Sequence, residues 1–260
     1  MEESNTIWRY FDLPKFCDLI QSSTLFFERA DKLKSFDRYE GRVLTEKQEF
    51  SYQNDLKSLD KSALDLSSEN FNMKYFQKDE DLTFHYENEK KKKKMIFINC
   101  WHRNKKESYA MWKVYAMTFG IAIKTKIQYL KKCFSRDFGI YNNNDCFASA
   151  HKAIITPVRY YDSEIATLEA KSIFCPYIRK RKEFEYENEI RCLILVGGTL
   201  DVTKEGFDII TPDNIKEKVN LNTLIEEVYV SPFAPVWFYN IVKDLCEKYE
   251  INKKVIQSNI

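Results

Sequence analysis

Short runs of aromatic and β-branched residues recur along the chain at irregular intervals, and this spacing most limits the fold. Such runs are typical of β-strands, whereas apolar residues three or four positions apart are typical of helices. We expect strands at residues 6–11, 24–27, 95–101, 121–125, 153–161, 188–196, 228–230 and 254–257. We expect helices at residues 14–21, 107–117, 127–134, 165–174 and 235–249, with Gly120 ending the second of these. The irregular alternation predicts an α+β fold, a mixed and mainly antiparallel central sheet with flanking helices.

Residues 42–94 differ from the rest of the chain because they are polar and show little apolar periodicity. They end in an unbroken lysine run, residues 90–94, whose mutual repulsion favours a solvated loop. An Asn-rich loop is also expected at 142–144. We therefore expect one α+β domain over residues 1–260, in which residues 42–94 form a helical, polar insertion.

The charge balance does not support nucleic acid as the partner. Lys and Arg together number 41 and Asp and Glu 39, whereas nucleic-acid binding usually shows as a basic excess. The acidic start of the chain lacks a signal-like apolar core, and no apolar stretch approaches the ~20 residues of a membrane helix. We expect a cytoplasmic protein with no membrane partner.

The cysteines do not form a metal-binding or disulfide pattern. There are 7 of them, none forms a C-x-x-C pair, and no His stands at ligand spacing beside them. Reduced thiols are the simplest account. The sequence therefore supports neither a metal nor a prosthetic group.

The strongest local pattern is the run from Tyr186 to Arg191. In a strand, alternate side chains share a face, so Glu187, Glu189 and Arg191 are expected together, with Ile190 on the core side. Two neighbouring carboxylates suit general acid/base catalysis or hydrogen bonding to a ribose hydroxyl. The alternative is a solvated strand face on which Arg191 neutralises a carboxylate.

A second pattern joins His102, at the end of a strand, to a helix that carries Ser108, Trp112 and Tyr115 along one side. The two aromatic rings could wall a slot for a planar ligand, with His102 as a titratable catalytic partner. The alternative is that this aromatic stripe only packs against the sheet.

A third pattern is Trp8-Arg9-Tyr10 in the first strand. An Arg between two aromatic residues points to the face opposite theirs, and a guanidinium suits contact with a phosphate. The alternative is a surface Arg, or one paired with Asp12 or with a carboxylate of the face that carries Glu187 and Glu189. Arg9 and Tyr10 are therefore candidate ligand-binding residues.

Several widespread nucleotide and hydrolase motifs are absent. The sequence contains no G-x-x-x-x-G-K-[ST], no G-x-G-x-x-G and no G-x-S-x-G. It therefore gives no support to P-loop hydrolysis, to dinucleotide binding of the Rossmann type or to α/β-hydrolase chemistry.

Taken together, sequence blocks along most of the chain resemble a bacterial family known only as a domain of unknown function. The blocks are W-R-Y-F-D at 8–12, L-F-F with R-A-D within 23–31, C-W-H at 100–102, E-S-x-A-M-W-x-x-Y at 107–115, K-R-x-x-F-x-x-E-x-E-x-R at 180–191 and V-S-P-F-A-P at 230–235. One departure is Arg38, which stands where that family has a proline. The resemblance implies no activity.

A shorter resemblance, to toxins and effectors of the ADP-ribosyltransferase class, implies a mechanism. Those proteins order an Arg or His, an aromatic or Ser-bearing element and a later Glu, as Arg9, residues 108–115 and Glu189 are ordered here. Arg9 would hold the pyrophosphate of NAD, Trp112 or Tyr115 would stack on nicotinamide, and Glu189 would bind the ribose hydroxyls. Glu187 would orient the acceptor.

Three functions follow as hypotheses. The first is an NAD-cleaving or ADP-ribosyltransferase-like effector in bacterial stress or phage defence, acting on a small nucleotide or a protein acceptor. The second is a non-catalytic module that binds a nucleotide or a protein. The third is a metal-dependent nuclease, which would need a third acid and a Lys that the sequence alone does not identify.

Overall fold

The computed structural model describes residues 1–33, 40, 91–140, 153–162, 173–203 and 206–260. It confirms the predicted α+β class, with a mixed and mostly antiparallel sheet of ten strands. These strands are β1 (Thr6–Asp12), β2 (Thr24–Arg29), β3 (Ile96–Arg103), β4 (Gly120–Lys126), β5 (Gly139–Ile140), β6 (Ala153–Pro157), β9 (Glu189–Leu195), β12 (Asn214–Lys218), β13 (Glu227–Val230) and β14 (Lys254–Gln257).

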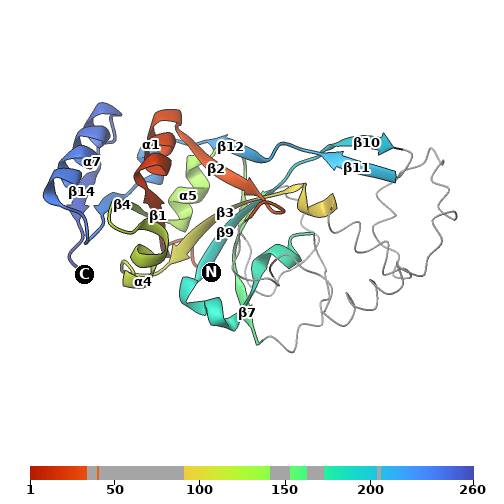
Figure 1. The fold of residues 1–260 in the computed structure, drawn as a ribbon, viewed down its shortest axis with the longest axis horizontal. Coiled ribbons are helices and arrows are strands. Elements are labelled where there is room, and N and C mark those ends of the chain that lie inside the picture. The colour runs from red at the N-terminus through yellow and green to blue at the C-terminus, as the bar shows by residue number, and fades with distance from the viewer. Residues whose placement is uncertain (34–39, 41–90, 141–152, 163–172, 204–205) are drawn as a thin grey trace.

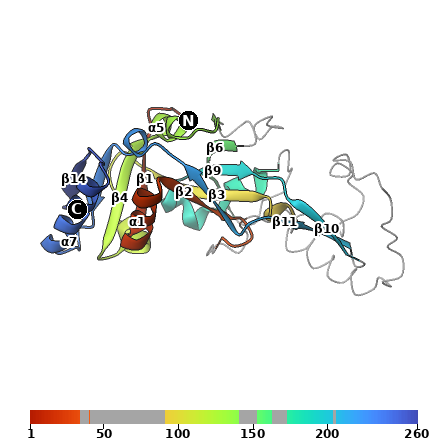
Figure 2. The same ribbon diagram turned by 90° about the horizontal axis from the view of Figure 1, so that it is seen from above.

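The main path of the sheet runs β14-β13-β4-β1-β3-β9-β6-β5, with β2 and β12 as a branch from β3. Among the described ladders of this ten-stranded sheet, the pairs at the two ends, β13–β14 and β5–β6, are parallel and the others are antiparallel. Two small sheets lie apart from this path, β7 (Arg159–Tyr161) with β8 (Arg179–Arg181), and the hairpin of β10 (Thr199–Thr203) and β11 (Gly206–Ile210). Figures 1 and 2 show that hairpin at one end of the molecule and β14 at the other.

The described helices are short, and several begin or end at residues that explain their limits. They are α1 (Leu13–Ser22), α4 (Tyr109–Met111), the π-helical turn η3 (Trp112–Ala116), α5 (Ile127–Cys133), the 3₁₀ turns η4 (Cys175–Ile178) and η5 (Lys182–Glu187), α6 (Leu221–Leu224) and α7 (Val236–Lys248). Asp12 caps α1 by accepting a hydrogen bond from the Lys15 amide at 2.9 Å. Ser23, with φ of 50°, ends α1 in the left-handed region.

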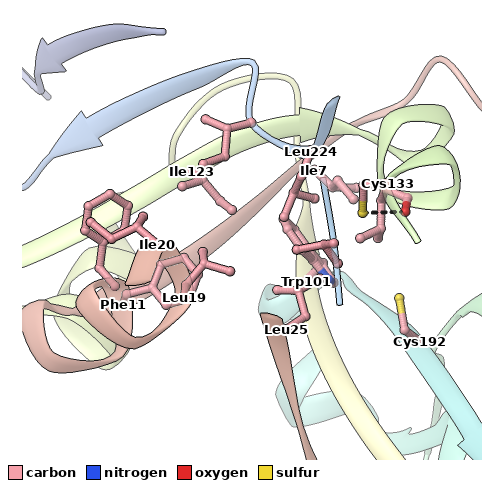
Figure 3. Close-up of a cluster of buried hydrophobic side chains, with 14 of the residues drawn as sticks. Ile7, Phe11, Leu19, Ile20, Leu25, Trp101, Ile123, Cys133, Cys192 and Leu224 are labelled. Atoms are coloured by element: carbon pink, nitrogen blue, oxygen red, sulfur yellow. Dashed lines mark hydrogen bonds between the residues drawn. The ribbon is translucent and has the colours of Figure 1, made fainter. Parts of the chain in front are cut away.

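The main core lies on one face of the sheet, where α1, α5 and α7 cover it. Ile7 and Phe11 of β1, Trp101 of β3 and Ile190 of β9 belong to this core, as alternation along each strand requires. Figure 3 shows Leu19 of α1 among its members, which come from several elements. The opposite face carries two smaller clusters, one against η4 and one against α4 and η3.

A local split in the sheet decides where a ligand can fit. One edge of β3 pairs with β9 along its length, while its other edge is shared between β1, at His102 and Arg103, and β2, at Phe97 and Ile98. In the described ladders, residues 99–101 pair with neither β1 nor β2. The chain leaves β1, forms α1 and returns as β2, so the two strands pair with opposite ends of the same edge of β3.

Several predicted elements agree with the structure, and others need correction. The strand at 254–257 matches β14, and the first helix matches α1 within a residue at each end. The predicted helix at 107–117 is instead α4 followed by a π-helical turn, and Gly120 begins β4 rather than ending that helix. The predicted strand at 153–161 divides at Val158 into β6 and β7, which belong to different sheets. The predicted helix at 165–174 lies outside the described residues except for Ile173 and Phe174, which form a turn. The loop at 142–144 and most of the insertion also lie outside the described residues.

Candidate functional site

A cavity of about 710 Å³ opens at the gap between β1 and β2. Its walls come from both strands, from α1, β3, β8, β9, η3 and η5, and include Tyr10, Trp101 and Tyr115. Seven of the nine candidate residues line it: Arg9, Tyr10, His102, Tyr115, Glu187, Glu189 and Arg191. The cavity therefore gathers segments that are far apart in the sequence.

A buried ion pair between Glu189 and Arg191 lies at the centre of the site. Arg191 donates from Nε to Glu189 Oε1 at 3.0 Å and from Nη2 to Glu189 Oε2 at 2.9 Å, and its Nη1 donates to the Tyr177 carbonyl at 2.6 Å. The two residues are 6% and 0% exposed, so this face is not solvated. Burial opposes ionisation of Glu189, but the charges of Arg191 and Lys180 outweigh it and lower its pKa to about 2.

Lys180 and Glu40 complete an ion cluster that we define as Glu40, Lys180, Glu187, Glu189 and Arg191. The Lys180 ammonium contacts Glu187, lies 3.2 Å from Glu189 Oε2 and lies 4.0 Å from Glu40 Oε2. Arg191 also contacts Glu40. Burial disfavours the Lys180 charge, yet the surrounding carboxylates, Glu189 first, raise its pKa above the ordinary value. An ammonium thus lies between three carboxylates, as a bound cation would.

Glu187 does not belong to the strand that carries Glu189, so that part of the prediction is wrong. It ends η5, and Asn188, with φ of 38°, turns the chain before β9 begins. The turn still brings the Glu187 carboxylate into the ion cluster, where it also accepts a hydrogen bond from the Tyr115 hydroxyl at 2.8 Å. Burial, and then the charge of Glu187, raise the pKa of Tyr115.

His102 is held in one orientation by a single hydrogen bond. Its Nδ1 lies 2.6 Å from the Glu187 carbonyl oxygen. A carbonyl only accepts, so Nδ1 carries the proton. Burial lowers the pKa of His102, which favours the neutral ring. The side chain is 4% exposed, and its Nε2 is buried without a hydrogen-bond partner among the described residues.

Ser108 and Trp112 do not line the cavity, and both have structural roles, so their assignment as ligand-binding residues is corrected. Trp112 is fully buried and donates from Nε1 to Glu107 at 2.9 Å. Ser108 caps α4 and donates its amide hydrogen to the Tyr10 hydroxyl at 2.9 Å. The aromatic stripe packs against the sheet through Trp112, while Tyr115 alone faces the cavity.

Arg9 reaches the cavity from the opposite face of the sheet. It alternates with Trp8 and Tyr10, and its guanidinium lies 5.4 Å from the Phe11 ring centroid and 5.8 Å from that of Trp101. Glu189 pairs across the ladder with His102, whose side chain shares the face of Trp8. Arg9 and Glu189 thus line one cavity only because the sheet is split there.

The guanidinium of Arg9 has an unused donor. Among the described residues, its buried Nη1 has no hydrogen-bond partner and no carboxylate forms an ion pair with the guanidinium. Burial disfavours the charged guanidinium and is the main reason that its pKa falls to about 10. The alternative pairing of Arg9 with Asp12 or with the carboxylates of the site is not found among the described residues; Asp12 instead caps α1 and pairs with Lys15.

Cys100, Lys180 and Glu40 were not identified as site residues from the sequence. Cys100 lies opposite Arg191 in the ladder, and its thiol interacts with Glu189. Burial, and then Glu189, raise the pKa of its thiol well above the ordinary value, so it is not an activated nucleophile. A signal for Lys180 did exist, since it begins the 180–191 block that ends in Arg191.

Comparison with family models, with curated proteins and with solved structures finds no match. The resemblance to the bacterial family and the resemblance to ADP-ribosyltransferases both stay predictions. Within the ranges that the structure describes, no helix has the length and apolar character needed to cross a membrane. In the same ranges, no three His, Cys, Asp or Glu side chains are grouped to hold a metal ion.

Proposed function

We propose that this chain binds a small, planar, anionic ligand of nucleotide size in the cavity at the split of the sheet. The observation that carries the proposal is the cavity itself, at about 710 Å³, which lies in the range of roughly 300–1,000 Å³ typical of small-molecule sites. Its aromatic walls suit a flat ring, and the unused donor of Arg9 suits an anionic group.

Binding fits the state of the carboxylates better than catalysis does. Glu189 accepts two hydrogen bonds from Arg191 and forms an ion pair with Lys180. Glu187 forms an ion pair with Lys180 and accepts a hydrogen bond from Tyr115. A general acid or base works best with a pKa near the working pH, and a value of about 2 at Glu189 is far from neutrality. We therefore assign the ion cluster a structural role, which is to hold the walls of the cavity in place.

Isothermal titration calorimetry and thermal unfolding with AMP, ADP and NAD test the proposal. A ligand present at 100 times its dissociation constant stabilises the folded state by about 2.7 kcal/mol, so the unfolding temperature rises by several degrees. Arg9→Gln should weaken binding about tenfold or more, because it removes a charge-assisted hydrogen bond. The matched control is Arg136→Gln, which removes a half-exposed guanidinium that pairs with Glu217 at 3.0 Å.

An absence of binding and of stabilisation with all three nucleotides at millimolar concentration would refute the proposal. Equal weakening by the Arg9 and Arg136 substitutions would refute the role of Arg9 as the anion contact. Both variants need an unliganded unfolding curve, so that a loss of folding is not mistaken for a loss of affinity.

The second candidate function is NAD cleavage by an ADP-ribosyltransferase-like effector in bacterial stress or phage defence. One specific observation favours it: Arg9, Tyr115 and Glu189 line the same cavity. A carboxylate beside a developing oxocarbenium charge would lower the barrier to cleavage of the bond to nicotinamide.

Release of nicotinamide from NAD, followed by chromatography with and without cell extract, tests this second function. Glu189→Gln should abolish turnover, whereas the control Glu217→Gln, on the surface strand β12, should leave it unchanged. No turnover by folded wild-type protein under any of these conditions, or full turnover by the Glu189 variant, would count against it.

A further inference from the structure

The least explained group in the cavity is the imidazole of His102. The residue is 4% exposed and lies at the cavity wall, and its buried Nε2 has no hydrogen-bond partner in the part of the chain that the structure describes. Buried polar groups in folded proteins are almost always paired, so an unpaired one calls for an explanation.

The environment of His102 fixes the chemical character of Nε2. Because Nδ1 donates its proton to the Glu187 carbonyl at 2.6 Å, Nε2 of the neutral ring carries a lone pair and no hydrogen. Nε2 is therefore an acceptor that faces a cavity. The two strongest donors nearby, Lys180 and Arg191, are already engaged with carboxylates of the ion cluster.

The surroundings of His102 narrow the kind of group that would pair with it. The ring of Tyr10 lies 6.2 Å from the imidazole, at an angle of 60°, and Tyr115 and Trp101 also line the cavity. Aromatic walls favour a flat heterocycle over a flexible chain. A neutral N–H group on the edge of such a ring can donate a hydrogen bond to Nε2 of His102, which is buried and uncharged.

We propose that His102 determines ligand specificity by accepting a hydrogen bond at Nε2 from an N–H group on the edge of a planar heterocycle, such as the exocyclic amine of a nucleobase. This inference rests on the proposed function, since it names the feature that the bound nucleotide must carry. It assigns His102 to recognition, whereas the sequence pattern predicts a catalytic partner.

Calorimetric titration with two ligands tests the inference directly. AMP carries an exocyclic amine, and purine riboside 5′-monophosphate is the same molecule without it. Wild-type protein should bind AMP about tenfold more tightly, the size expected of one hydrogen bond to a group that is otherwise left unpaired.

Two substitutions at the same position give matched variants. In His102→Asn the side-chain amide nitrogen lies near the place of Nδ1, so the bond to the Glu187 carbonyl is kept and the Nε2 acceptor is lost. In His102→Gln the longer side chain places an amide oxygen near the place of Nε2. The tenfold preference for AMP should vanish in His102→Asn and return at least in part in His102→Gln.

The outcomes separate this inference from the proposed function. If wild-type protein binds both ligands equally, or if the preference for AMP survives in His102→Asn, the role of His102 is refuted and the binding cavity stands. If neither ligand binds the wild-type protein, the role of His102 is refuted, and the proposed function fails as well if ADP and NAD also do not bind. The comparison of two ligands on the wild-type protein needs no variant, so it remains decisive even if a substitution prevents folding.

Discussion

Replacing Lys180 with Met tests whether the ion cluster depends on its central ammonium. The substitution keeps an unbranched side chain of similar length and removes the charge. Lys180 is 9% exposed, and its Nζ lies 3.2 Å from Glu189 Oε2 and 4.0 Å from Glu40 Oε2, besides its contact with Glu187. Without Lys180, three carboxylates face a single cation, Arg191.

The expected loss of stability is large because the remaining charges are buried. At an effective dielectric constant of about 20, two unit charges 3.2 Å apart attract by about 5 kcal/mol. Part of this gain is offset in the wild type by desolvation of the ammonium. Removing one partner from a buried ionic group typically costs about 3–5 kcal/mol, and we expect the free energy of unfolding to fall by that amount at pH 7.

The pH dependence identifies the cause of this loss. With Lys180 absent, mutual repulsion raises the pKa of a carboxyl group in the folded state above its unfolded value. The folded variant then binds a proton more readily than the unfolded chain. Its deficit relative to wild type is therefore greatest at neutral pH and shrinks as the pH falls toward about 4.5, by up to roughly 1.4 kcal/mol per unit for each proton.

Urea unfolding at pH 7, 6 and 5, followed by the fluorescence of the 4 Trp residues, measures both effects. The control is Lys216→Met, which removes a half-exposed ion pair with Asp18 at 2.6 Å and should cost less than about 1 kcal/mol at every pH. A loss below about 1 kcal/mol in the Lys180 variant, or a loss that does not change with pH, would refute the electrostatic account.

Two further predictions concern stability. Gly120→Ala should destabilise the protein by about 1–3 kcal/mol, because the new Cβ would lie 2.4 Å from the Ala116 Cβ and 2.5 Å from the Ala116 carbonyl oxygen. Gly197→Ala is its control, since a Cβ there meets nothing within 4 Å, and equal unfolding temperatures for the two would contradict the clash. Ionised Glu189 should add about 3 kcal/mol of stability that is complete above its ordinary pKa of 4.5 and is lost as the pH falls toward about 2. Urea unfolding between pH 5 and pH 3 should show this decline in wild type and a weaker one in Glu189→Gln; identical slopes would argue against it.

The sequence predicts strands and helices well where local pattern and tertiary packing agree. β14 has the composition of a strand and α1 has apolar residues at helical spacing, and the structure places both where the pattern predicts them. The turn η3 is different, because Trp112 and Ala116 are buried at helical spacing, yet the chain is π-helical there. β12 has the mostly polar sequence Asn-Ile-Lys-Glu-Lys. Because these residues do not favour a strand by themselves, β12 depends on its pairing with β2.

For the site, the sequence identifies residue types better than it identifies their neighbours. Arg191 beside Glu189 follows from alternation along one strand, and the structure confirms that they share a face. Glu40 could not be found in this way, because it is far from Arg191 in the sequence and no periodicity relates them. The position of Arg9 depends on the split between β1 and β2, which arises from long-range pairing that local pattern does not encode.

A continuous sheet normally acts as a wall that isolates the side chains of its two faces from each other. Here, in the described ladders, residues 99–101 have strand partners on one edge only, and the opening beside them joins the main core to the ion cluster. A ligand bound in that opening would lie between β1 and β2 and would contact Arg9 on one face of the sheet and His102 on the other. Ligand binding should therefore affect both faces of the sheet at the same time. We expect α1 and η5 to become more rigid together when the cavity is occupied.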